Sequence, residues 1–162
     1  MSDYLEGIPT VDLNLFLNGT DSEKNEFVNQ LGKAYEDIGF VAVKNHLISD
    51  VEIGALYTEV KNFFSLSQEV KTSYEIEGLA GQRGYISFGR EHAKDSSAGD
   101  LKEFWHFGQE VVDGDPIKSQ YPDNVFTKET PDFHEVGLKA YKSLETTGKH
   151  MLRAIAIFLG LD

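Results

Sequence analysis

The 162-residue sequence contains no cysteine. Disulfide bonds, thiolate nucleophiles, zinc fingers and iron–sulfur ligation are therefore excluded for this chain, and a metal ion would need histidine, aspartate or glutamate. Positive charge is also scarce, since 15 basic residues stand against 27 acidic ones and the formal net charge is −12. No cluster of lysine and arginine matches a phosphate backbone, so the sequence predicts no binding to nucleic acid.

Long apolar runs are absent as well. No segment approaches the length needed to span a bilayer, and residues 1–13 lack the basic and apolar regions of a secretory signal. We therefore expect a cytoplasmic protein without membrane contact. Apolar residues make up 40% and charged residues 26%, a balance typical of a folded domain rather than a disordered chain.

Recognisable catalytic and metal-binding motifs are missing too. None of the five histidines is followed two positions later by aspartate or glutamate, the spacing with which the 2-His-1-carboxylate iron triad normally begins on a strand. A His-Glu-x-x-His motif, a nucleophile elbow and a P-loop are also absent. We expect no catalytic residue and no metal ligand in this chain, and we interpret His106 as a structural residue.

Hydrophobic periodicity and capping signals predict short strands between amphipathic helices. Glycine-rich residues 78–89 read as a loop that runs into a strand, and the polar residues 91–99 as a mobile connection. The other expected elements, in chain order, are a strand over 8–13, a helix from the Thr20–Glu23 capping box to Gly39, a strand over 39–46, a helix from a second capping box at Ser49 to Phe64, a further helical turn within 65–74, a strand over 101–107 and a long helix from Thr130 to Gly160.

The segment from Leu101 to Phe107 is unusually aromatic. On a strand, alternate residues point to opposite faces. The sequence therefore predicts that Glu103, Trp105 and Phe107 share one face with Leu101, and that His106 lies on the other face with Lys102 and Phe104.

The predicted helices carry more apolar surface than the few strands can cover. On the last helix the inner stripe is expected to comprise Phe133, Val136, Ala140, Leu144, Met151, Ile155 and Phe158. This imbalance indicates a missing packing partner.

Arg83 lies between Gly81 and Gly84, and Tyr85 follows Gly84 directly. A cation and a phenol on a loop with close backbone approach suit recognition of a small molecule that carries a carboxylate. The alternative is that Arg83 pairs with one of the many acids of the chain.

Taken together, several segments resemble the N-terminal half of isopenicillin N synthase-type, 2-oxoglutarate- and Fe(II)-dependent oxygenases. Two positions depart from the family pattern, because Ser67 and Tyr121 stand where proline and tryptophan are usual. The matching segments are Ile8-Pro9-Thr10-Val11-Asp12-Leu13; Gly39-Phe40-Val41 with Asn45-His46; Phe63-Phe64-Ser65-Leu66 with Glu69 and Lys71; Arg83-Gly84-Tyr85 with Gly89, Glu91, Asp100-x-Lys102-Glu103 and Phe107-Gly108; Tyr121-Pro122; and Leu159-Gly160-Leu161-Asp162.

The resemblance implies an α+β fold over residues 1–162: a helical N-terminal dioxygenase-type domain with a few short strands, which in the family packs against a double-stranded β-helix. That β-helix carries the iron triad and the 2-oxoglutarate clamp, and it follows the Leu-Gly-Leu helix. We therefore expect the chain to be a fragment or a naturally short relative, with Fe(II) and 2-oxoglutarate belonging to the full-length enzyme. By the same resemblance, the residues nearest to the substrate are Gln82, Arg83, Tyr85, Glu103, Trp105 and Phe107.

The resulting hypothesis is an oxygenase part that acts on a small molecule by hydroxylation or desaturation and is inactive by itself. One alternative is a stand-alone, non-catalytic interaction module that covers its apolar face by self-association or with a partner. Another is an enzyme that, like isopenicillin N synthase, uses O₂ without 2-oxoglutarate.

Overall fold

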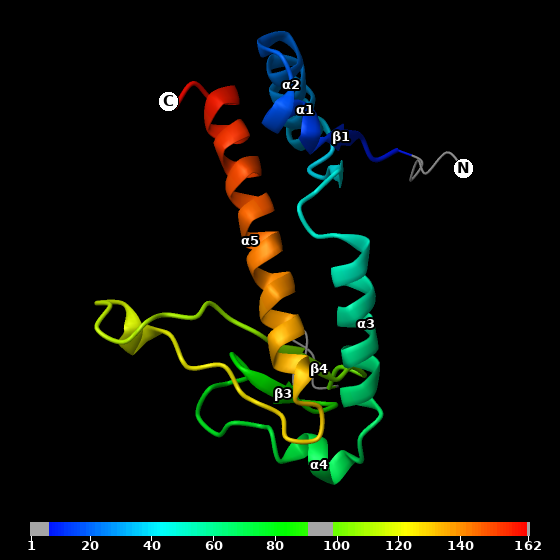
Figure 1. Ribbon diagram of the computed structural model, residues 1–162, viewed down its shortest axis with the longest axis vertical. Helices are drawn as coiled ribbons and strands as arrows, with labels where there is room; N and C mark the ends of the chain where they lie inside the picture. Colours follow the sequence, from blue (N-terminus) through cyan, green and yellow to red (C-terminus); the bar gives the residue numbers. More distant parts are fainter. Residues whose placement is uncertain (1–6, 91–98, 162) are drawn as a thin grey trace. The chain divides into compact units, whose positions relative to one another are not determined.

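The computed structural model describes residues 7–90 and 99–161 (Figure 1). The chain divides into two compact units, residues 1–49 with 143–162 and residues 50–142. Its elements are β1 (Thr10–Asp12), α1 (Leu13–Asn18), α2 (Asp21–Asp37), β2 (Ala42–Lys44), α3 (Asp50–Phe64), α4 (Gln68–Thr72), β3 (Gly84–Ile86), β4 (Phe104–His106), the 3₁₀ helix η1 (Lys118–Gln120) and α5 (Asp132–Phe158). The expected α+β class, helical with a few short strands, is confirmed.

In the first unit, β1 and β2 pair in parallel, with Val11 opposite Val43. The predicted capping box starts α2, because the Thr20 side chain accepts from the backbone N–H of Glu23 and the Glu23 carboxylate accepts from the backbone N–H of Thr20. The backbone N–H and the hydroxyl of Thr20 both donate to this carboxylate and hold the pKa of Glu23 below its usual range. The helix ends at Asp37 with Ile38 as its C-cap, and the expected terminating residue Gly39 follows with a φ of +81°, which suits glycine.

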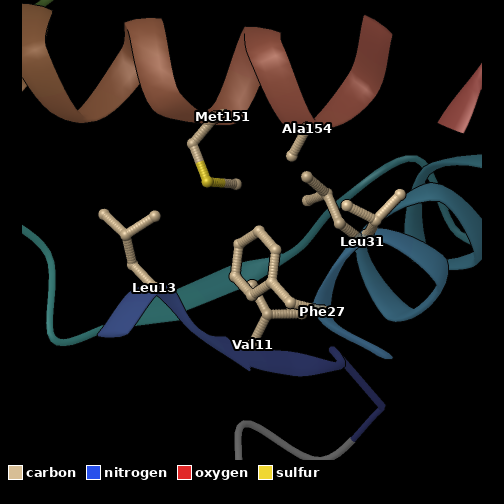
Figure 2. Packing of buried hydrophobic residues seen from close by; sticks show 7 residues of the cluster. Val11, Leu13, Phe27, Leu31, Met151 and Ala154 are labelled. Carbon is tan, nitrogen blue, oxygen red and sulfur yellow. The ribbon is translucent and has the colours of Figure 1, made fainter. Parts of the chain in front are cut away.

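The core of the first unit forms where α2 and the C-terminal part of α5 meet the β1–α1 segment. Phe27 and Leu31, one turn apart on α2, are fully buried, and Met151 and Ala154 contribute from α5. Figure 2 shows these side chains converging with Val11 and Leu13. Gly32 lies against the ring of Phe158, which an added Cβ would approach to 2.3 Å.

In the second unit, β3 and β4 form an antiparallel pair. A separate aromatic core surrounds it, centred on the fully buried Phe63 of α3, Tyr85 of β3 and Phe133 of α5. Phe63 and Phe133 stack with ring centroids 5.1 Å apart. The start of α4 is set by a local signal, because the Ser67 side chain caps the helix by accepting from the backbone N–H of Val70 at 3.3 Å.

Several sequence predictions were wrong in detail. The strand expected over 101–107 is shorter, because β4 covers only Phe104–His106 and Leu101 is 96% exposed. Leu144, placed on the inner stripe of the last helix, is 55% exposed. Helix α1 was not predicted, although Asp12 caps it by accepting from the backbone N–H of Asn14. The connection expected over 91–99 lies mostly outside the described residues.

Candidate functional site

The β3–β4 pair brings together most of the residues expected near a substrate. Tyr85 lies directly opposite Trp105 in the register of the two strands. Trp105 packs on Phe63 with ring centroids 4.8 Å apart, and the ring of Phe107 lies 5.9 Å from that of Trp105. The predicted alternation therefore holds for Trp105 and Phe107, which contact the same aromatic core.

His106 lies on the opposite face, as predicted. Its side chain is exposed, with the ring 4.9 Å from that of Phe104 and Nδ1 2.5 Å from the carbonyl oxygen of Gly81. These contacts hold the imidazole against Phe104 of β4 and against the loop that precedes β3. The structure thus gives His106 a structural environment.

Two glycines allow this packing. An added Cβ on Gly137 of α5 would lie 2.1 Å from the tip of the Phe107 ring. An added Cβ on Gly108 would lie 1.9 Å from the guanidinium carbon of Arg83. The side chain of Asn124 also fixes Gly108, with bonds of 2.8 and 2.9 Å to its backbone N–H and C=O. Neither glycine carries a sequence signal that identifies its role before its neighbours are known.

Glu103 is the centre of a partly buried polar group that we term the Glu103 network, made of Gln68, Lys71, Tyr85 and Glu103. The ammonium of Lys71 donates to both carboxylate oxygens of Glu103, at 2.9 and 2.7 Å, and the Tyr85 hydroxyl donates to Oε2. Gln68 in turn donates to the Tyr85 hydroxyl oxygen at 3.1 Å. A buried ion pair persists only when its remaining polar groups are satisfied in this way.

Burial and the adjacent carboxylate of Glu103 raise the pKa of Tyr85 to about 12. The phenol therefore remains protonated at neutral pH and acts as a hydrogen-bond donor. The Lys71 ammonium also lies 5.9 and 5.7 Å from the ring centroids of Phe64 and Tyr85. The network thus anchors the residue that precedes β4 to helix α4.

Arg83 is buried, with 8% of its surface exposed. Its Nη1 donates to the carbonyl oxygen of Gln82 at 2.6 Å, whereas its buried Nε has no hydrogen-bond partner among the described residues. Within residues 7–90 and 99–161 no carboxylate pairs with Arg83, so the alternative of an ordinary surface ion pair finds no support there. A buried cation with spare donors has capacity left for an acceptor.

Two more expected residues differ in environment. Gln82 is exposed on the loop before β3. Trp105 has a buried Nε1–H without a partner in the described chain. The structure therefore brings Tyr85, Glu103, Trp105 and Phe107 together around β3 and β4, with Arg83 against Gly108, and leaves Gln82 at the surface.

The described residues do not furnish an iron site. Across residues 7–90 and 99–161, no three side chains of histidine, aspartate or glutamate come together in a group that could hold a metal ion. His46 and His134 each have a buried Nδ1 without a hydrogen-bond partner in the described chain, and the ring of His134 stacks on Phe126 with ring centroids 3.6 Å apart. In the same described part of the chain, no helix is long and apolar enough to cross a membrane.

The helical fold with its β3–β4 aromatic hairpin is that of the N-terminal region of 2-oxoglutarate/Fe(II) oxygenases. A crystal structure of a 2-oxoglutarate–Fe(II) oxygenase family protein from Caulobacter crescentus matches 95% of this chain and 49% of its own, with a TM-score of 0.82 and 34% identity. The crystal structure of a Neurospora crassa protein in complex with α-ketoglutarate and thymine matches 96% of this chain and 49% of its own, with a TM-score of 0.77 and 25% identity.

Sequence comparison gives the same result. Residues 8–129 match the family described as the N-terminal region of the non-haem dioxygenase in morphine synthesis, and the chain belongs to this family. The 2-oxoglutarate-Fe(II) type oxidoreductase ppzD of Metarhizium rileyi is 31% identical over 92% of this chain and 44% of its own length. The homoarginine-6-hydroxylase 2-ODD-C23 of Glycine max is 29% identical over 99% of this chain and 51% of its own. The chain thus spans about half the length of these relatives.

Proposed function

We propose that the chain is the N-terminal part of a non-haem Fe(II)- and 2-oxoglutarate-dependent oxygenase that hydroxylates or desaturates a small molecule. The observation that carries the proposal is the match of residues 8–129 to the N-terminal dioxygenase family, together with relatives that this chain covers only to about half. Iron and 2-oxoglutarate would bind to a further part of the protein, because the described residues do not fit an iron site. No chemical step is therefore assigned to this chain.

Exposed apolar side chains support the presence of a further part. On α5 and at the position directly after it, three leucines that we term the exposed leucines of α5, Leu144, Leu152 and Leu159, are 55%, 67% and 59% exposed. Spacings of eight and seven residues place these leucines on one side of the helix. A row of exposed leucines is typical of a surface that another part of a protein covers.

We further propose that the residues around β3 and β4 form the side of the protein nearest to the substrate. Arg83 supports this assignment most directly, because it is buried and its Nε lacks a partner in the described chain. Such a donor suits a carboxylate or another anionic oxygen of the small molecule. Trp105 and Phe107 would offer apolar contact, and Gln82 a further polar one. Tyr85 and Glu103 would act by holding the start of β4, since their polar atoms bond to one another and to Lys71.

The test begins with the intact mass of the protein that the native gene produces in its own cells. A mass well above 18.1 kDa supports the proposal, whereas a mass of 18.1 kDa contradicts it and favours the stand-alone module. The purified gene product would then receive Fe(II), O₂, 2-oxoglutarate and a small-molecule extract of the same cells. Succinate formation with a product heavier by one oxygen or lighter by two hydrogens is the expected result. Equal turnover without 2-oxoglutarate would instead indicate chemistry like that of isopenicillin N synthase.

The assignment of Arg83 is tested by Arg83→Gln in the same gene product. We expect the KM for the small molecule to rise at least about tenfold, because a charge-assisted hydrogen bond is lost. The matched control is Arg90→Gln, since Arg90 is exposed and pairs with Glu75 at 2.9 Å. An unchanged KM in Arg83→Gln, with the fold intact by circular dichroism, contradicts the assignment.

A further inference from the structure

The first unit contains a groove that the oxygenase proposal does not use. It has a volume of about 620 Å³ and lies among α1, α2 and the C-terminal part of α5. Its apolar lining comes from Phe16, Leu17, Val28 and Ile157. Volumes of roughly 300–1,000 Å³ are typical of small-molecule sites, and so is an apolar lining with a few polar groups.

The polar lining of this groove is mainly basic. Lys24 of α2 and Arg153 and His150 of α5 reach it, with Asn25 as a neutral donor and Asp21 as the one acid. This composition is unusual in a chain with 27 acidic and 15 basic residues. A local excess of positive charge on an acidic protein favours an anion at this place.

The basic groups of the groove are also available. In the described part of the chain, the side chains of Lys24 and Arg153 form no ion pair or hydrogen bond, and the His150 ring has no polar partner there. Two other lysines of the same unit differ: Lys44 lies 3.6 Å from Asp12 and Lys149 lies 2.9 Å from Glu145. Three basic side chains without a polar partner in the described chain therefore line one groove, whereas Lys44 and Lys149 pair with acids.

We infer that this groove binds a small organic anion with an apolar body, such as an aromatic or aliphatic carboxylate. The carboxylate would accept hydrogen bonds from Arg153 and Lys24, and Phe16, Leu17, Val28 and Ile157 would cover the apolar body. Arginine suits this role because its guanidinium can donate two parallel bonds to one carboxylate. The inference uses residues of the first unit only and does not depend on the proposed oxygenase function.

The test uses naphthalene-2-carboxylate as the anionic probe and naphthalene-2-carboxamide as its neutral counterpart of the same shape. Each is titrated into the 162-residue chain by calorimetry, and amide chemical shifts locate the contact by NMR. We expect saturable binding of the carboxylate, at least about tenfold weaker binding of the carboxamide, and shifts confined to residues that line the groove. Affinity should fall as salt is raised.

Substitutions provide the second arm. Arg153→Gln and Lys24→Gln should each weaken carboxylate binding about tenfold, whereas the matched control Lys33→Gln, on the same helix as Lys24 but outside the groove lining, should leave it unchanged. Both groove substitutions are at surface positions, and circular dichroism checks the fold. Equal affinity for the two probes, no saturable binding, or shifts spread over the exposed leucines of α5 would each overturn the inference.

Discussion

Glu103 was expected to face a substrate, yet its carboxylate bonds to Lys71 and Tyr85 inside the second unit. Lys71 is itself almost fully buried. Removing one partner of a buried pair leaves the other charge without compensation, which is more damaging than the loss of an exposed pair. At the scale of single residues, Lys71 is therefore the side chain on which the start of β4 depends.

We predict that Lys71→Met lowers the free energy of unfolding by about 3 kcal/mol, because Glu103 then lies partly buried without its counter-charge. Urea denaturation followed by circular dichroism measures the change. The exposed pair Lys149–Glu145 gives the control, since Lys149→Met should lower stability by no more than about 0.5 kcal/mol. The double variant Lys71→Met with Glu103→Gln should regain part of the loss. Equal effects of Lys71→Met and Lys149→Met would contradict the role given to the Glu103 network.

Tyr85 gives a prediction about pH. Its folded-state pKa of about 12 lies above its usual value of 10.0, so the protonated phenol favours the folded state. That contribution is fully present below pH 10 and is lost as pH rises from 10 to about 12. We therefore expect the urea midpoint of the wild-type chain to fall more steeply over this range than that of Tyr85→Phe.

A second measurement isolates the same group. Ultraviolet absorbance of tyrosinate should show an ionisation near pH 12 that disappears in Tyr85→Phe. The outcome that would count against a buried donor at this position is twofold: urea midpoints of the two proteins that fall in parallel with pH, and tyrosinate absorbance curves that are the same in both.

At the scale of one element, α5 carries two glycines in different surroundings. Gly137 lies against the Phe107 ring, whereas an added Cβ on Gly148 meets nothing within 4 Å. Alanine raises intrinsic helix stability equally at both positions. We predict that Gly148→Ala stabilises the protein by about 0.5–1 kcal/mol. Gly137→Ala should destabilise it by about 1–3 kcal/mol, because the packed ring must move. Urea midpoints of both variants measure this difference, and two changes of the same sign would refute the close approach of Phe107.

The sequence was sufficient to predict elements whose signals are local. Thr20 and Glu23 specify the start of α2 by bonds within one turn, and Gly39 ends the same helix with a positive φ. The ends of β4 could not be predicted in this way. Ladder bonds to β3 stop at the Gly84–His106 and Ile86–Phe104 pairs, so the length of β4 depends on a partner distant in sequence. Leu144 fits the helical period of α5 yet lies on its exposed side, because the period alone does not say which apolar side chains find a partner.

The same distinction applies to the candidate site. Strand alternation placed Trp105 and Phe107 on one face, and the structure agrees. Lys71, Gln68, Gly108 and Gly137 were not assigned to the site, because each acts through one contact with a residue distant in sequence. For Lys71, its place beside Glu69 in the family-like segment was the one signal available. The substrate-facing roles of Gln82, Arg83 and the β4 residues remain predictions.

At the scale of the whole molecule, the exposed leucines of α5 decide between the oxygenase part and the stand-alone module. We predict that the isolated chain binds the uncharged hydrophobic dye Nile red, because Leu144, Leu152 and Leu159 offer an uncovered apolar surface. Replacing all three with glutamine should reduce dye fluorescence at least about twofold while the free energy of unfolding changes by no more than about 1 kcal/mol. Leu101→Gln is the matched control, since Leu101 is 96% exposed but lies outside α5, and it should leave dye binding unchanged. A monomeric wild-type chain that unfolds cooperatively and binds no dye would contradict this prediction. It would favour the stand-alone module, because such a module does not leave an apolar surface exposed for a further domain to cover.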